Sequence, residues 1–165
     1  MDASDKKRIA AKAALDFVES GTILGVGTGS TVNYLIEMLP GIRDRIDAVV
    51  SSSKASTELL QEQGFDVQTL NETGDIDVYI DGADECNKRL HLIKGGGGAL
   101  TREKVLAAAA RRFVCIVDDS KFVGMLGTFP VPIEVLPMAQ EFIVRKLMKM
   151  RVQPIWRDGF VTDNG

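Results

Sequence analysis

The stretch "IKGGGGALTREK", residues 93–104, combines three residue types that can do chemistry: a lysine, a run of glycines and a glutamate. Glycine weakens an ordered element, and a linker would not normally lead straight into a helix-forming sequence, so flexibility alone explains the run poorly. A glycine turn can instead present backbone N–H groups, and Glu103 falls on an otherwise apolar stripe of the helix expected from about Ala99. Together with Lys94, these groups could move a proton and stabilise the negative charge that then develops. For Glu103 alone, the simpler interpretation is an acid favoured by the dipole at a helix start.

Acidic side chains cluster in "DGADE", residues 81–85, directly after the apolar run "IDVYI". Asp81, Asp84 and Glu85 therefore stand at the carboxyl end of an expected strand, where the ligands of open α/β sheets bind. Taken singly, each acid is better interpreted as part of a solvated Asp-Gly turn. A magnesium site built on the carboxylates is a further alternative. The clustering favours chemistry but does not choose the reaction.

A second glycine-rich turn, "GVGTGST" at residues 25–31, lies between an expected strand and an expected helix. Free N–H groups at the start of that helix could bind an anion, which predicts a phosphate cradle. No lysine precedes Ser30 and Thr31, so the turn is not a Walker loop, and Ser30 stands where a dinucleotide-binding turn needs its third glycine. A tight strand-to-helix turn without a ligand explains this motif, taken alone, equally well.

Strand-like and helical patterns alternate along most of the chain. Short apolar runs are expected as strands at residues 22–27, 47–52, 65–70, 76–80 and 112–118. Near-continuous apolar strands separated by helices are typical of a parallel sheet covered on both faces, so the predicted fold class is α/β with an open, Rossmann-like, mostly parallel sheet. We expect residues 1–129 to form this catalytic domain. Residues 130–165 should begin a small α+β subdomain, in which Asp158-Gly159 marks a tight hairpin.

Composition and charge argue against several classes of function. A net charge of −3 and a pI near 5.2 make nucleic acid a poor partner, since such proteins usually carry a basic face. No apolar run reaches the length of a membrane span, and the charged N-terminus does not resemble a signal peptide, so we expect a cytoplasmic protein with no membrane partner. His91 is the only histidine, and no set of His or Cys residues has the spacing of metal ligands. We therefore expect no metal site.

Five motifs, in this order and at these separations, resemble type A ribose-5-phosphate isomerase: "GVGTGST", "SSSKAST", "DGADE", "IKGGGGALTREK" and "PIEVLPMA". The resemblance runs from the first helix to the last residue, and the combination is highly specific although each motif alone is not. It implies interconversion of D-ribose 5-phosphate and D-ribulose 5-phosphate through an enediolate, with neither metal nor organic cofactor.

The resemblance also implies roles for individual residues. Glu103 would be the base that moves a proton between C2 and C1, with Asp81 and Lys94 beside the reacting oxygens. Residues expected to bind the phosphosugar are Lys7, Gly27, Thr28, Gly29, Ser30, Thr31, Asp81, Gly82, Asp84, Lys94, Gly95, Gly96, Gly97 and Lys121. A homodimer is expected from the family. Family chains continue beyond the sequence "VTDNG", so we expect the small subdomain to be truncated.

Three other functions compete with the isomerase. A non-catalytic phosphosugar sensor on a similar sheet would keep the phosphate cradle but would not need Asp81, Lys94 and Glu103 together. A dehydrogenase fits poorly because the dinucleotide spacing fails. A magnesium-dependent phosphatase would use the acids of "DGADE" as metal ligands.

Overall fold

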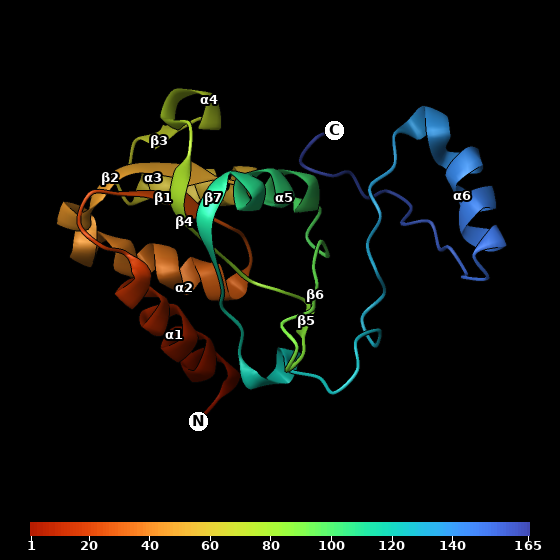
Figure 1. Ribbon diagram of the computed structural model, residues 1–165, viewed down its shortest axis with the longest axis horizontal. Helices are drawn as coiled ribbons and strands as arrows, with labels where there is room; N and C mark the ends of the chain where they lie inside the picture. The colour runs from red at the N-terminus through yellow and green to blue at the C-terminus, as the bar shows by residue number, and fades with distance from the viewer.

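The structure is a computed structural model that describes residues 1–165. Its centre is a five-stranded parallel sheet with the strand order β3-β2-β1-β4-β7 (Figure 1). The strands are β1 (Thr22–Val26), β2 (Ile46–Ser51), β3 (Val67–Gln68), β4 (Ile76–Asp81) and β7 (Ala110–Cys115). The order changes direction at β1, as in doubly wound sheets, so the predicted α/β class is confirmed.

Six α-helices connect or follow the strands. They are α1 (Ala3–Ala14), α2 (Ser30–Met38), α3 (Lys54–Glu62), α4 (Leu70–Thr73), α5 (Leu100–Ala109) and α6 (Gln140–Lys149). Helices α1 and α2 pack together and share a large apolar cluster with β1 and β4, to which Leu24, Leu35 and Ile80 belong. A smaller cluster joins α5 to the sheet through Leu106, Ile76 and Tyr79. Because apolar side chains pack against both faces, the central strands are buried and read as continuous apolar runs.

A small antiparallel pair, β5 (Glu85–Cys86) with β6 (Leu92–Ile93), interrupts the alternation after β4. The N–H of Asp84 donates to the carbonyl of Ile93 at 2.8 Å, so the chain returns to the end of β4 before it enters the glycine run. This return decides where Lys94 lies. The sequence pattern did not predict the pair, because each strand is only two residues long.

The chain after residue 130 differs from the prediction of an antiparallel α+β unit. Helix α6 is present and stands apart from the sheet (Figure 1), but no strand follows β7. Asp158 and Gly159 do form a turn, closed by the N–H of Phe160 on the carbonyl of Arg157 at 3.2 Å, yet the flanking runs do not pair as a hairpin. The N–H of Asp163 instead donates to Gly98 at 3.1 Å. Backbone groups that bond to the glycine run are not available for a cross-strand ladder.

Two other features of the chain bear on the predictions. The expected strand at 65–70 is reduced to two residues at the sheet edge, followed by α4. None of the helices combines the length and the apolar character needed to cross a membrane. The division at residue 129 into two units stays a prediction.

Candidate active site

Asp81 is the last residue of β4, and its carboxylate accepts more hydrogen bonds than any other acid of the site. Its Oδ1 accepts from the N–H of Thr28 at 3.0 Å and of Gly82 at 2.7 Å, while Oδ2 accepts from the Tyr79 hydroxyl at 2.6 Å and from Lys94 at 2.9 Å. Burial, and then the charge of Asp81, raise the pKa of Tyr79, so the phenol stays protonated and donates. With 1% of its side chain exposed, Asp81 is held rigidly beneath the pocket.

Lys94 follows β6 and brings a positive charge between two acids. Its Nζ lies 2.9 Å from Oδ2 of Asp81 and 3.0 Å from Oε2 of Glu103, and it donates to the carbonyl of Gly82. Burial alone would lower the pKa of Lys94, but Asp81 and Glu103 outweigh burial, and the pKa is raised. The ammonium group is therefore a fixed positive charge at neutral pH.

Glu103 lies in the first turn of α5 and points into the pocket rather than into water. Only 4% of its side chain is exposed. Its Oε2 is buried and forms an ion pair with Nζ of Lys94 at 3.0 Å. Burial, and then the charge of Asp81, raise its pKa, and Lys94 opposes them. A buried carboxylate that has a raised pKa and lines a pocket is suited to accept and return a proton.

The turn before α2 forms the other end of the site. Gly29 is the N-cap of α2 with φ +106° and supplies no side-chain cap, so the first N–H groups of the helix remain free for an anion. Lys7, on α1, donates to Oγ of Ser30 at 2.9 Å. Gly27 must be glycine, because a Cβ there would lie 2.0 Å from Oδ1 of Asp81. The phosphate-cradle prediction and the acidic motif thus meet in one place.

The glycine run is held close to the second acid of "DGADE". Gly96 donates its N–H to Oδ2 of Asp84 at 2.9 Å, and its carbonyl accepts from Arg157 at 3.1 Å. A Cβ at Gly96 would lie 2.8 Å from Cζ of Phe129 and 2.9 Å from Oδ1 of Asp84. The glycine therefore allows the close approach that the sequence suggested, although the groups that come close belong to the protein itself.

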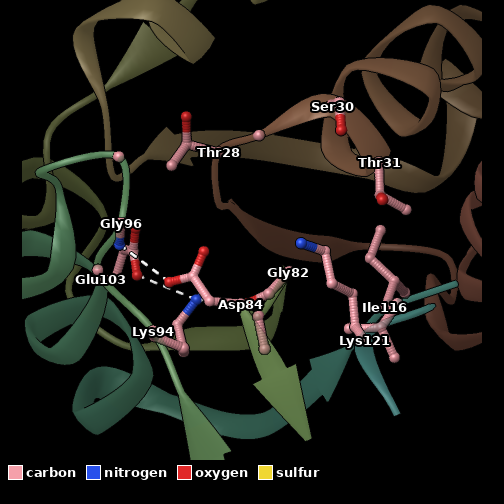
Figure 2. Close-up of a pocket in the computed structure, with 15 residues that line it drawn as sticks. Thr28, Ser30, Thr31, Gly82, Asp84, Lys94, Gly96, Glu103, Ile116 and Lys121 are labelled. Carbon is pink, nitrogen blue, oxygen red and sulfur yellow. Dashed lines mark hydrogen bonds and ion pairs between the residues drawn. The ribbon is translucent and has the colours of Figure 1, made fainter. Parts of the chain in front are cut away.

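These residues surround one pocket of about 180 Å³. Asp84, Lys94, Gly96 and Glu103 gather on one side of it, and Ser30, Thr31 and Lys121 stand on the other, with the Lys121 ammonium group directed inward (Figure 2). The predicted residues that line the pocket are Thr28, Gly29, Ser30, Thr31, Gly82, Asp84, Lys94, Gly95, Gly96, Gly97, Glu103 and Lys121. The pocket thus places a buried proton acceptor at one end and anion-binding groups at the other.

Three predicted residues do not line the pocket. Gly27 and Asp81 lie beneath its wall, where Asp81 fixes Lys94, and Lys7 reaches the site only through Ser30. Conversely, sequence reasoning missed Ala83, Ile116 and Val117, which line it, and Tyr79, which bonds Asp81. Ile116 and Val117 follow β7, so the rule that ligands bind beyond strand ends could have found them. No group of three or more His, Cys, Asp or Glu side chains in the chain is placed to hold a metal ion.

The fold and the pocket define a class: an α/β enzyme with a doubly wound sheet, whose site beyond the strand ends suits proton transfer on a small anionic substrate. The chain belongs to the ribose 5-phosphate isomerase A (phosphoriboisomerase A) family, whose model matches residues 48–165. Members of this family are aldose–ketose isomerases, so the isomerase prediction is confirmed and the sensor is not favoured.

Solved structures of ribose 5-phosphate isomerases match the fold of this protein along nearly its whole chain. Ribose 5-phosphate isomerase A from Neisseria gonorrhoeae is 47% identical with a TM-score of 0.96, covering 99% of this chain and 74% of that one. A D-ribose-5-phosphate isomerase in complex with phospho-erythronic acid is 39% identical with a TM-score of 0.89, covering 100% and 77%. The enzyme from Methanocaldococcus jannaschii is 36% identical with a TM-score of 0.89, covering 99% and 77%. The resemblance therefore includes residues 1–47, which the family model leaves out.

Proposed function

We propose that this chain interconverts D-ribose 5-phosphate and D-ribulose 5-phosphate, with Glu103 as the group that carries the proton. The observation that carries the proposal is the buried Glu103 carboxylate, which is only 4% exposed, lines the pocket and forms an ion pair with Lys94 at 3.0 Å through its Oε2. Burying a carboxylate is costly even when a cation pairs with it, so such a group is expected where it serves chemistry.

The proton transfer follows from these positions. Glu103 takes the proton from C2 of the open-chain aldose, the C–H electron pair forms the C1=C2 double bond, and negative charge develops on O1. Lys94 and N–H groups of the glycine run stabilise this charge, and one such fixed donor contributes about 3 to 4 kcal/mol. Glu103 then returns its proton to C1, while the O2 hydroxyl proton passes to O1. The ketose is an isomer of the aldose, so no electrons or atoms are gained or lost.

Asp81 acts on this reaction through Lys94, because it lies beneath the pocket and its Oδ2 accepts from that ammonium group. Asp84 is expected to bind the sugar hydroxyls, since one of its oxygens holds Gly96 and the residue lines the pocket. At the far end, the free N–H groups of α2, with Ser30 and Lys121, would hold the phosphate. The bound phospho-erythronic acid of the 39% identical enzyme, a phosphorylated sugar acid, supports this substrate class.

A homodimer in the cytoplasm completes the proposal. Exposed apolar side chains after residue 130 support a contact with another chain, because Leu136 is 71%, Met138 93% and Ile155 79% exposed. Small-angle scattering of the purified protein would establish the number of chains in the particle. A monomer at all concentrations would contradict the dimer without bearing on the reaction.

The decisive experiment compares Glu103→Gln with the parent chain. Glutamine keeps the size of the side chain but cannot accept a proton from carbon, so turnover should fall roughly 10²-fold or more while binding of ribose 5-phosphate stays nearly unchanged. Ketose formation gives the rate, and calorimetric titration gives the affinity. Ser30→Ala is the matched variant at the phosphate end, and it should act mainly on affinity. Parental turnover in Glu103→Gln would leave the glutamate a helix-start acid and remove the mechanism.

A further inference from the structure

Glu85, the third acid of "DGADE", is buried but does not line the pocket. It is 4% exposed, and no lysine, arginine or histidine forms an ion pair with it. Asp84, its neighbour, faces the pocket. A buried carboxylate without a cation must be stabilised by hydrogen bonds, and such a costly arrangement implies a specific task.

The two oxygens of Glu85 hold a segment that lies more than forty residues later in the chain. Oε2 accepts from the N–H of Gly127 at 2.8 Å, and Oε1 accepts from the N–H of Phe129 at 2.6 Å. This segment contains no helix or strand of its own, so its N–H groups have no ladder to bond to. Hydrogen bonds to a charged acceptor are the stronger kind, and one carboxylate fixes two backbone positions.

Phe129 connects this anchor to the pocket. Its Cζ occupies the space next to Gly96, where a Cβ would come within 2.8 Å. The N–H of Gly96 in turn donates to Oδ2 of Asp84 at 2.9 Å (Figure 2). The contacts thus run from Glu85 through Phe129 and Gly96 to Asp84, and they return to the residue that precedes Glu85 in the sequence.

We propose that Glu85 is a positioning residue: its carboxylate anchors residues 127–129, so that the Phe129 ring holds the Gly96 N–H against Asp84. Glu85 does not touch the substrate. It sets the position of the pocket wall at the sugar end, while the phosphate end at Gly29 to Thr31 does not depend on it. The kinetic part of this inference rests on the proposed function, and the structural part does not.

The test uses Glu85→Gln and Phe129→Leu in the full chain. Glutamine offers one acceptor and places its NH₂ against the second N–H, so one hydrogen bond is lost and the 127–129 segment loosens. Phe129→Leu keeps both hydrogen bonds of Glu85 but removes the ring from Gly96. In both variants we expect deuterium exchange in the peptide covering residues 94–98 to quicken about tenfold, and kcat/KM for ribose 5-phosphate to fall about tenfold.

Inorganic phosphate serves as the probe of the other end, and its inhibition constant should change by less than about twofold. Glu72→Gln is the matched control, because the Glu72 carboxylate also accepts a backbone N–H, from Thr69 at 2.6 Å, but lies outside the pocket. That variant should change neither the exchange of 94–98 nor kcat/KM.

Several outcomes would overturn the positioning role. Unchanged exchange at 94–98 in a folded Glu85→Gln variant is one, and an equal loss of phosphate binding is another, since it would mean general loosening. If Glu85→Gln does not fold, the test rests on Phe129→Leu. Deuterium exchange at residues 94–98 and a kcat/KM equal to those of the parent chain in that variant would refute the inference. If the parent chain does not isomerise ribose 5-phosphate, the proposed function fails, and the exchange measurement still tests the anchor.

Discussion

Gly27→Ala probes the junction between the two glycine-rich motifs. The new Cβ would lie 2.0 Å from Oδ1 of Asp81, whereas contacts under 3.0 Å are essentially absent for real Cβ atoms, so the two groups must separate by at least 1.0 Å (3.0 minus 2.0). The backbone of Gly27 is fixed, because its N–H donates to Ile80 at 2.8 Å and its carbonyl accepts from Ser56 at 2.6 Å. The Asp81 carboxylate therefore has to move.

That displacement sets the expected magnitudes. Oδ1 of Asp81 would lose its donors on Thr28 and Gly82, and Lys94 would lose its anchor. A misplacement of about 1 Å near the reacting atoms can lower turnover about 10²-fold. Overpacking and weakened hydrogen bonds to a charged acceptor should lower the free energy of unfolding by about 2 to 4 kcal/mol. For a chain of this length the melting temperature then falls by about 6 to 12 °C.

Two measurements test this reasoning, the rate of ketose formation and thermal unfolding followed by circular dichroism. Gly41→Ala is the matched control, because a Cβ there meets nothing within 4 Å and the residue lies away from the pocket. It should keep parental turnover and stability within about 0.5 kcal/mol. Parental turnover in Gly27→Ala would mean that Asp81 can move without consequence, and the role given to it would be wrong.

Four further predictions concern pH, metal ions and association. Burial raises the pKa of Glu103 above its usual 4.5 in the protein without substrate, so kcat/KM, which reports the free enzyme, should fall on acidification with a midpoint above 4.5. Because the pKa of Glu103 is higher in the folded chain, the unfolded chain releases this proton at lower pH than the folded chain does. The free energy of unfolding should therefore decrease as pH rises from 4.5 through the folded-state pKa. The Glu103→Gln variant should lack this decrease. Exhaustive chelation should leave turnover unchanged, whereas a loss restored by magnesium would favour the "DGADE" acids as ligands. The exposed apolar side chains after residue 130, with Trp156 53% exposed, predict self-association in sedimentation velocity, and a stable monodisperse monomer would refute this.

The sheet could be predicted from the sequence because the type of each helix or strand depends mainly on residues that are close together in the chain. Apolar runs bounded by glycines and helix-forming segments fix the type of each element, and the carboxyl ends of parallel strands share one edge. The acids after β4 and the turn before α2 could therefore be placed together in advance. The position of Glu103 on the apolar stripe of a helix indicated that its carboxylate faces the interior, but for this residue alone the sequence left a helix-start acid as the simpler interpretation.

The hairpin predicted at Asp158-Gly159 shows where such patterns fail. An Asp-Gly pair favours a turn in any context, and the turn is present. Whether the flanking runs pair depends on competing partners, and here the backbone N–H of Asp163 donates to Gly98 in the glycine run instead. The turn depends on the local sequence, whereas the pairing of strands depends on residues that are far apart in the chain.

The sequence by itself determined the α/β alternation, the two glycine-rich turns and the presence of a base, a lysine and acids near one edge of the sheet. Only the tertiary structure decided that Lys94 stands between Asp81 and Glu103, because the short β5–β6 return carries no readable periodicity. It also decided that Glu85 bonds residues 127 and 129, far along the chain. The physical reason is that side-chain periodicity follows the local backbone, whereas a buried charge is stabilised by whichever donors the whole fold brings to it.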